Sequence, residues 1–115
     1  MTVTIYHNPR CSKSCATLAL LEARGLKPKI VDYLKTPPSA AELKAILRKL
    51  GLNPRDILRT GETVYAKLGL KTRELDDDAL IAQMVKNPIL IERPIVVAGN
   101  KAAVGRPPEN VLAIL

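Results

Sequence analysis

The only two cysteines of this chain, Cys11 and Cys15, stand four residues apart, one residue more than in the C-x-x-C motif of redox dithiols. Cys11 follows a loop that contains Pro9 and precedes a segment rich in Ala and Leu, which predicts a helix. The free N–H groups in the first turn of a helix lower the pKa of a thiol placed there, and they also bind anions. We therefore expect Cys11 to be a nucleophile beside a bound oxyanion.

The neighbours of Cys11 are mostly polar or basic, which supports this interpretation. Ser14 can donate a hydroxyl hydrogen bond, and a protonated His7 would add positive charge next to Arg10. A buried cysteine that acts as a small apolar residue is the alternative for Cys11. His7 is weaker evidence, because a single histidine is about as often an ordinary loop residue, and no other residue completes a metal-ligand set. We predict no metal site.

Two roles are open for Cys15, a resolving thiol and a packed helix residue. Residues four apart in a regular helix are separated by about 6 Å along the axis. A disulfide needs the two Cβ atoms within about 4.5 Å. A bridge to Cys11 would therefore require the first turn to unwind, and we favour a packed helix residue.

Short hydrophobic patterns predict the elements that must position Cys11. Residues 2–6 and 29–33 are expected to form strands, with a helix over residues 12–23 between them that ends at Gly25. A strand, helix and strand in this order favour a parallel pair with a right-handed crossover.

The middle of the chain is predicted to be helical. Ser39 and Glu42 have the spacing of a capping box at the start of an amphipathic helix, and Gly51 ends that helix. Short helical pieces are expected over residues 53–71, and a further helix over residues 76–86.

The C-terminal part predicts a β-hairpin and a last helix. Apolar strands over residues 95–98 and 102–104 are joined by Gly99-Asn100, and residues 109–115 can form a short helix. The complete order is that of a thioredoxin-like fold with a central mixed sheet and helices inserted before the hairpin, which is one of several α/β folds compatible with this pattern. We expect one domain over residues 1–115, with no internal repeat.

The formal charge of +7 indicates an anionic partner without identifying it. Nucleic acid is disfavoured, because the chain has no long basic run, no zinc-finger spacing, and only three Tyr with no Phe or Trp to stack on bases. No apolar run approaches the roughly 18 residues of a membrane helix, and the first residues do not form a signal peptide. We therefore expect a cytoplasmic protein with reduced thiols that does not bind a membrane. One small core accounts for every apolar stripe in the sequence, so none remains for a subunit interface. This favours a monomer.

The stretch His7-Asn8-Pro9-x-Cys11-x-x-Ser14, followed by a helix, resembles the glutaredoxin-coupled arsenate reductase family of thioredoxin-like proteins. Three further stretches match this family, namely Ile57-Leu58-Arg59, Arg93-Pro94-Ile95-Val96-Val97 and Gly105-Arg106-Pro107. Residues 33–38 and 87–91 are similar to family sequence as well. The resemblance covers nearly the whole chain, and several motifs in the right order are more specific than any one alone.

The resemblance implies that the Cys11 thiolate attacks arsenate, that glutathione attacks the adduct, and that glutaredoxin recycles the enzyme while arsenite leaves. The implied site residues are the nucleophile Cys11, a thiolate-supporting His7, and the oxyanion ligands Ser14, Arg59, Arg93 and Arg106. A planar guanidinium offers paired donors to a tetrahedral oxyanion, which agrees with these roles. Glutathione is implied as a co-substrate, with no bound cofactor. We also predict a cis peptide bond between Arg93 and Pro94, where thioredoxin-like folds carry a cis-proline.

Cys15 departs from the family, which usually has arginine at this position. Two alternatives to an arsenate reductase therefore stay open. One is a thiol-dependent enzyme of the same fold that acts on another substrate, such as a glutathione conjugate. The other is a redox-sensing regulator that docks on RNA polymerase, although the absence of C-x-x-C and the presence of three arginines disfavour it.

Overall fold

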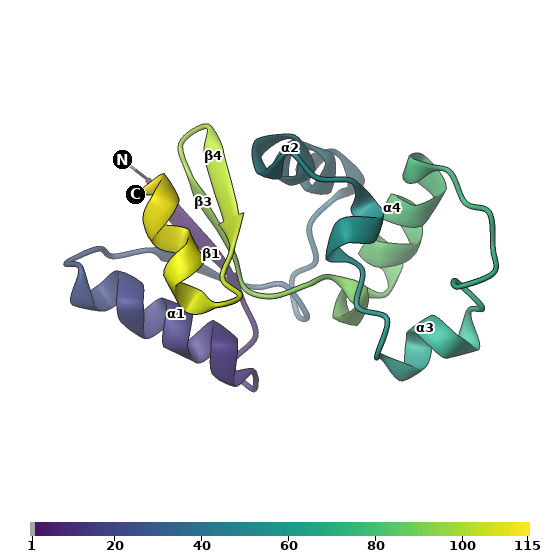
Figure 1. Ribbon diagram of the computed structural model, residues 1–115, viewed down its shortest axis with the longest axis horizontal. Helices are drawn as coiled ribbons and strands as arrows, with labels where there is room; N and C mark the ends of the chain where they lie inside the picture. Colours follow the sequence, from purple (N-terminus) through teal and green to yellow (C-terminus); the bar gives the residue numbers. More distant parts are fainter. Residues whose placement is uncertain (1) are drawn as a thin grey trace. The chain divides into compact units, whose positions relative to one another are not determined.

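The structure, a computed structural model, describes residues 2–115, and the chain divides into two compact units (Figure 1). The first unit contains the residues up to Thr36 together with the segment Arg93–Leu115, and the second unit is Pro37–Glu92.

The first unit is built on a four-stranded mixed sheet with the strand order β2-β1-β3-β4. The central strand β1 (Val3–His7) is parallel to β2 (Lys29–Asp32) and antiparallel to β3 (Ile95–Ala98). The edge strand β4 (Lys101–Val104) completes a hairpin with β3. The predicted parallel pair and hairpin are both confirmed. Gly99, with φ of 62°, accommodates the tight turn between the hairpin strands.

Two helices cover this sheet, α1 (Ser12–Ala23) and the 3-10 helix η3 (Pro108–Ile114), and they pack against each other. The predicted bounds of α1 are confirmed, and Gly25 follows its end with φ of 78°. The last segment was expected to be a short helix, and it is a 3-10 helix that begins directly after Pro107. The sheet and the helices bury a common apolar core formed by Val3, Ile5, Leu21, Val96, Ala98 and Val111.

The second unit is helical. It contains α2 (Ala40–Leu50), the 3-10 helix η1 (Pro54–Ile57), α3 (Thr63–Lys67), α4 (Asp77–Lys86) and the 3-10 helix η2 (Pro88–Leu90). Helix α4 packs against α2, η1 and η2. This arrangement confirms the predicted succession of helices in the middle of the chain.

Local side chains determine where the two longer helices of this unit begin. The Ser39 hydroxyl accepts a hydrogen bond from the Glu42 N–H at 3.1 Å, and the Asp76 carboxylate accepts one from the Ala79 N–H at 2.7 Å. Gly51, in the left-handed conformation, ends α2. The apolar faces of α2 and α4 are buried at Leu43, Ile46, Leu47, Leu80, Ile81 and Met84, whereas Leu50 and Val85 are only half-buried.

Over residues 2–115, no helix is both long enough and apolar enough to cross a bilayer.

Candidate active site

The loop between β1 and α1 is organised by Asn8, which is 4% exposed. Its carbonyl accepts a hydrogen bond from the Cys11 N–H at 3.0 Å, and its side-chain oxygen accepts one from the Arg10 N–H at 2.9 Å. Its own N–H donates to the Ser14 hydroxyl at 3.0 Å. These bonds hold Cys11 as the residue that precedes α1, with extended backbone at φ of −98° and ψ of 122°. Sequence reasoning assigned no role to Asn8, although an Asn before a Pro is a signal for a turn.

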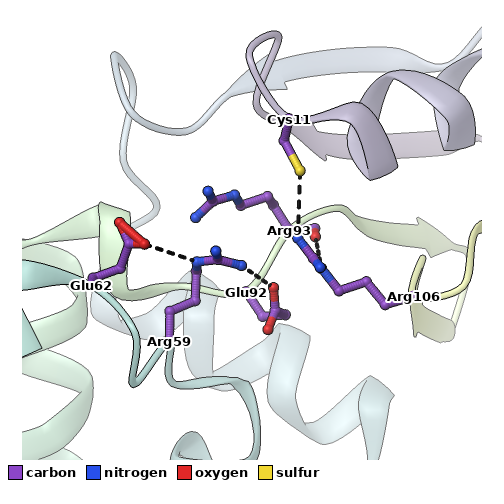
Figure 2. Close-up of polar contacts among 6 residues, drawn as sticks. All are labelled: Cys11, Arg59, Glu62, Glu92, Arg93 and Arg106. Atoms are coloured by element: carbon purple, nitrogen blue, oxygen red, sulfur yellow. Dashed lines mark hydrogen bonds and ion pairs between the residues drawn. The ribbon is translucent and has the colours of Figure 1, made fainter.

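The Cys11 thiol lies beside several donors. Burial raises the pKa of Cys11, but the N–H of Ser14, the side chain of Arg93, the N–H of Lys13 and the charge of Arg106 together lower it below its ordinary value. Figure 2 shows the Arg106 guanidinium next to the sulfur, with Nη2 at 3.5 Å from Sγ. The lowered pKa agrees with the sequence-based expectation of a thiolate at the start of a helix.

The hairpin brings Arg93 and Arg106 to one place. Ile95 of β3 faces Val104 of β4 in the register of the hairpin. Arg93 lies two positions before Ile95, and Arg106 lies two positions after Val104. The Arg106 Nε donates to the Arg93 carbonyl at 2.9 Å. The peptide bond between Arg93 and Pro94 is cis, which confirms the prediction, and the bond that follows Arg106 is cis as well, which the sequence did not suggest.

Gly105 allows the segment that carries Arg106 to approach α1. A Cβ atom at position 105 would lie 2.6 Å from the Thr17 Oγ1 and 2.8 Å from the Pro94 Cγ, closer than side chains tolerate. Thr17 is buried and its hydroxyl donates to the Lys13 carbonyl at 2.8 Å, so it has little freedom to move away. Only glycine fits here without displacing its neighbours.

His7 and Ser14 form a buried pair, with 2.6 Å between Nδ1 and Oγ. Burial lowers the pKa of His7, and the opposing effect of Asp32 is smaller. The imidazole is therefore neutral at neutral pH, which corrects the expectation that a protonated His7 adds positive charge. Because the Ser14 oxygen already accepts the Asn8 N–H, we assign the hydroxyl proton to a bond with Nδ1 of neutral His7.

Ser14 faces Cys11 through its main chain rather than its hydroxyl. The side chain is fully buried and hydrogen-bonded to His7 and Asn8. The sequence predicted a hydroxyl that is free to donate to an anion, and this expectation is wrong. Its N–H contributes instead, since it is one of the groups that lower the pKa of Cys11. The physical reason is that the face of α1 that carries Ser14 packs inward.

Cys15 is exposed, and both cysteines are free thiols. The Cys15 thiol donates to the Pro9 carbonyl at 3.3 Å. The expectation of a packed helix residue is therefore wrong, because the buried residues of α1 are Ser14, Thr17 and Leu21 and position 15 lies off that face.

Arg59 belongs to the second unit, where two carboxylates hold its guanidinium. Its Nη1 lies 2.6 Å from the Glu92 Oε1, and its Nε lies 3.5 Å from the Glu62 Oε2 (Figure 2). An antiparallel bridge between Leu58 and Ile91 aligns the two segments. Glu62 is only three positions from Arg59, whereas Glu92 is 33 positions away, so no local signal in the sequence points to Glu92.

The part of the chain that the structure describes contains no group of three or more His, Cys, Asp or Glu side chains arranged to hold a metal ion.

The ArsC family model matches residues 6–114 of this chain. An arsenate reductase from Neisseria meningitidis is 53% identical over 114 residues, which cover 98% of this chain and 97% of that protein. The solved structure of an arsenate reductase from Vibrio cholerae is 54% identical, with a TM-score of 0.96 and coverage of 100% of this chain and 98% of the other. That of a putative arsenate reductase from Yersinia pestis is 55% identical, with a TM-score of 0.92 and coverage of 96% and 98%. These similarities confirm the predicted thioredoxin-like α/β fold.

Proposed function

Because this chain belongs to the ArsC family, we propose that it is a thiol oxidoreductase that reduces arsenate to arsenite, with Cys11 as the nucleophile. The names of relatives that match over nearly their whole length support this substrate. The observation that carries the proposal is the Cys11 sulfur at the start of α1, 3.5 Å from the Arg106 guanidinium and with its pKa lowered. A thiolate and anion-binding donors in one place suit attack on an oxyanion.

In the first step, the Cys11 thiolate forms a bond to arsenic, and one arsenate oxygen leaves as water after protonation. Arg93 and Arg106 bind the remaining oxygens and stabilise the negative charge that they carry. Their contacts to the thiolate support this role. By resemblance to the family, Arg59 is a third oxyanion ligand, and Ser14 contributes through its N–H.

Neutral His7 acts in this proposal as a positioning residue rather than as a charge. Its Nδ1 accepts a hydrogen bond from the Ser14 hydroxyl, with 2.6 Å between Nδ1 and Oγ, and the Ser14 oxygen in turn accepts one from the Asn8 N–H. The pair thereby holds the first turn of α1, whose N–H groups face the thiolate.

Glutathione is the proposed co-substrate and glutaredoxin the proposed partner. The glutathione thiol displaces a second oxygen from arsenic as water. A glutaredoxin thiolate then attacks the glutathione sulfur and forms a mixed disulfide, and the electron pair of the broken sulfur–arsenic bond reduces As(V) to As(III). Water finally releases arsenite and regenerates the Cys11 thiol. Since these reaction steps need a reducing compartment, we propose a cytoplasmic location.

The test is arsenate-dependent oxidation of NADPH by the purified protein, coupled through glutathione reductase and glutaredoxin. Turnover is expected with the native chain, and Cys11→Ser should abolish it. Circular dichroism establishes that both proteins are folded. A folded native protein that gives no oxidation above the arsenate-free control would contradict the proposal.

A further inference from the structure

A pocket of about 290 Å³ lies in the first unit, beside the loop that carries the nucleophile. It is lined by Asn8, Pro9, Arg10, Asp32, Leu34 and Lys35. One wall is the loop after β1, which leads directly into Cys11, and the other is the end of β2 and the residues that follow it. The chemistry proposed above for Cys11 uses none of the charged residues in this wall.

The pocket carries charges of both signs that do not neutralise one another. Asp32 supplies a carboxylate, and Arg10 and Lys35 supply cations. None of the three belongs to an ion pair among residues 2–115. The charge of Asp32 is also not cancelled by its register partner His7, since burial lowers the pKa of that histidine and keeps it neutral.

Among residues 2–115, one oxygen of the Asp32 carboxylate has no hydrogen-bond donor. The Asp32 Oδ1 is buried and has no hydrogen-bond partner in the described part of the chain. Buried polar atoms in native proteins are almost always satisfied by protein, water or ligand. Asp32 lines the pocket, so a charged N–H donor from a ligand there would pair with the carboxylate more strongly than a neutral donor would.

An acidic group and two basic groups around one small pocket complement a zwitterion, such as the amino-acid end of a larger molecule. The volume of about 290 Å³ is at the lower limit of ligand pockets, so it suits one end of a peptide rather than a whole drug-sized ligand. Pro9 and Leu34 supply an apolar wall for methylene groups. We propose that this pocket binds the γ-glutamyl end of glutathione, with its ammonium on Asp32 and its α-carboxylate on Arg10 and Lys35.

This inference rests on the proposed function, because it assigns the subsite of the proposed co-substrate. Glutathione anchored by its γ-glutamyl end has its thiol one residue further along the peptide. The loop wall of the pocket is likewise continuous with Cys11, whose N–H donates to the Asn8 carbonyl at 3.0 Å. The pocket would therefore raise the local concentration of the attacking thiol next to the arsenic adduct.

The experiment uses S-methylglutathione, which has no free thiol, so that binding is measured without arsenate and without turnover. The full chain labelled with ¹⁵N is titrated and followed by NMR. The amide signals of Asn8, Arg10 and Lys35 should shift. Asp32→Asn should weaken binding about tenfold, as expected for the loss of one charge-assisted hydrogen bond.

A second ligand isolates the contact to Asp32. N-acetyl-S-methylglutathione lacks the ammonium, so it should bind the native chain about as weakly as S-methylglutathione binds the Asp32→Asn variant. The same substitution should then have no further effect on the acetylated ligand. Lys35→Gln should weaken both ligands, and Lys29→Gln, an exposed lysine on β2 outside the pocket, is the matched control that should weaken neither.

Three results would overturn the assignment: no shift at saturating ligand, shifts confined to other residues, or equal weakening of both ligands by Asp32→Asn. These results are independent of arsenate. If the chain binds S-methylglutathione here but does not reduce arsenate, the pocket assignment stands and the proposed function is contradicted. If the chain reduces arsenate but shows none of these shifts, the proposed function stands and the pocket assignment is contradicted.

Discussion

The Nη2 of Arg106 lies 3.5 Å from the Sγ of Cys11, although 95 positions separate the two residues in the chain. The hairpin of β3 and β4 returns the chain to the start of α1, and Gly105 allows the close approach. The lowered pKa of Cys11 therefore depends in part on a cation that lies near the other end of the sequence.

Replacing Arg106 with Gln should raise the pKa of Cys11, because a positive charge next to the thiolate is lost. Alkylation of Cys11 by iodoacetamide at neutral pH should slow, and kcat/KM for arsenate should fall roughly 100-fold, as for other lost oxyanion donors. The pH dependence of the alkylation rate measures the pKa directly. Arg24→Gln, at the exposed opposite end of α1, is the control and should leave the profile unchanged. An unchanged profile for the Arg106 variant would mean that the two residues are not coupled.

Replacing Gly105 with Ala should destabilise the protein by about 1–3 kcal/mol, since the added Cβ would lie 2.6 Å from the Thr17 Oγ1. Urea unfolding measures the change in free energy. The matched control is Gly61→Ala, where a Cβ meets no atom within 4 Å and φ is not in the left-handed region. Equal stability of the two variants would show that the contact of Gly105 with α1 is looser than the structure indicates.

Replacing Cys15 with Ser should leave arsenate turnover within about twofold, because the Cys15 thiol bonds to the Pro9 carbonyl and forms no disulfide with Cys11. The coupled NADPH assay provides the rate. Maleimide labelling of the folded native protein should modify the exposed Cys15 thiol, and mass spectrometry after proteolysis locates the label. Loss of glutathione-dependent turnover in Cys15→Ser would instead assign a resolving role to this thiol.

The stability of the fold should decrease as the pH falls below about 6.5, the ordinary pKa of histidine. The pKa of His7 is lowered by burial, so in this range the unfolded chain binds a proton that the folded chain does not. The free energy of unfolding therefore rises with pH up to the ordinary pKa and loses this dependence above it. Urea unfolding of the native chain and of His7→Gln across this range isolates the contribution. Parallel curves for the two proteins would contradict the lowered pKa.

The pair of Arg59 and Glu92 should be coupled by about 1 kcal/mol, near the upper end for partly exposed ion pairs, because Nη1 and Oε1 lie 2.6 Å apart. A double-mutant cycle with Arg59→Gln and Glu92→Gln, measured by urea unfolding, gives this energy. The coupling should weaken in high salt. A coupling energy of zero at low salt would mean that the pair is not formed in solution.

The sequence alone determined the elements, because the signals that begin and end them act over a few residues. Helix α1 has the predicted bounds, Ser39 caps α2, and the hairpin turns at Gly99. The position of Cys11 before a helix was predictable for the same reason. The expectation of a lowered thiol pKa followed from that position and from no long-range contact.

Only the tertiary structure decided which groups surround the thiol and in which charge state. Burial, which depends on the whole fold, makes His7 neutral and turns the Ser14 hydroxyl away from an incoming anion. The same packing leaves Cys15 exposed. Arg106 reaches Cys11 through a hairpin, and Glu92 meets Arg59 across 33 positions of the chain. Desolvation and contacts between distant residues have no signature in a short stretch of sequence, because they arise when separate elements pack together.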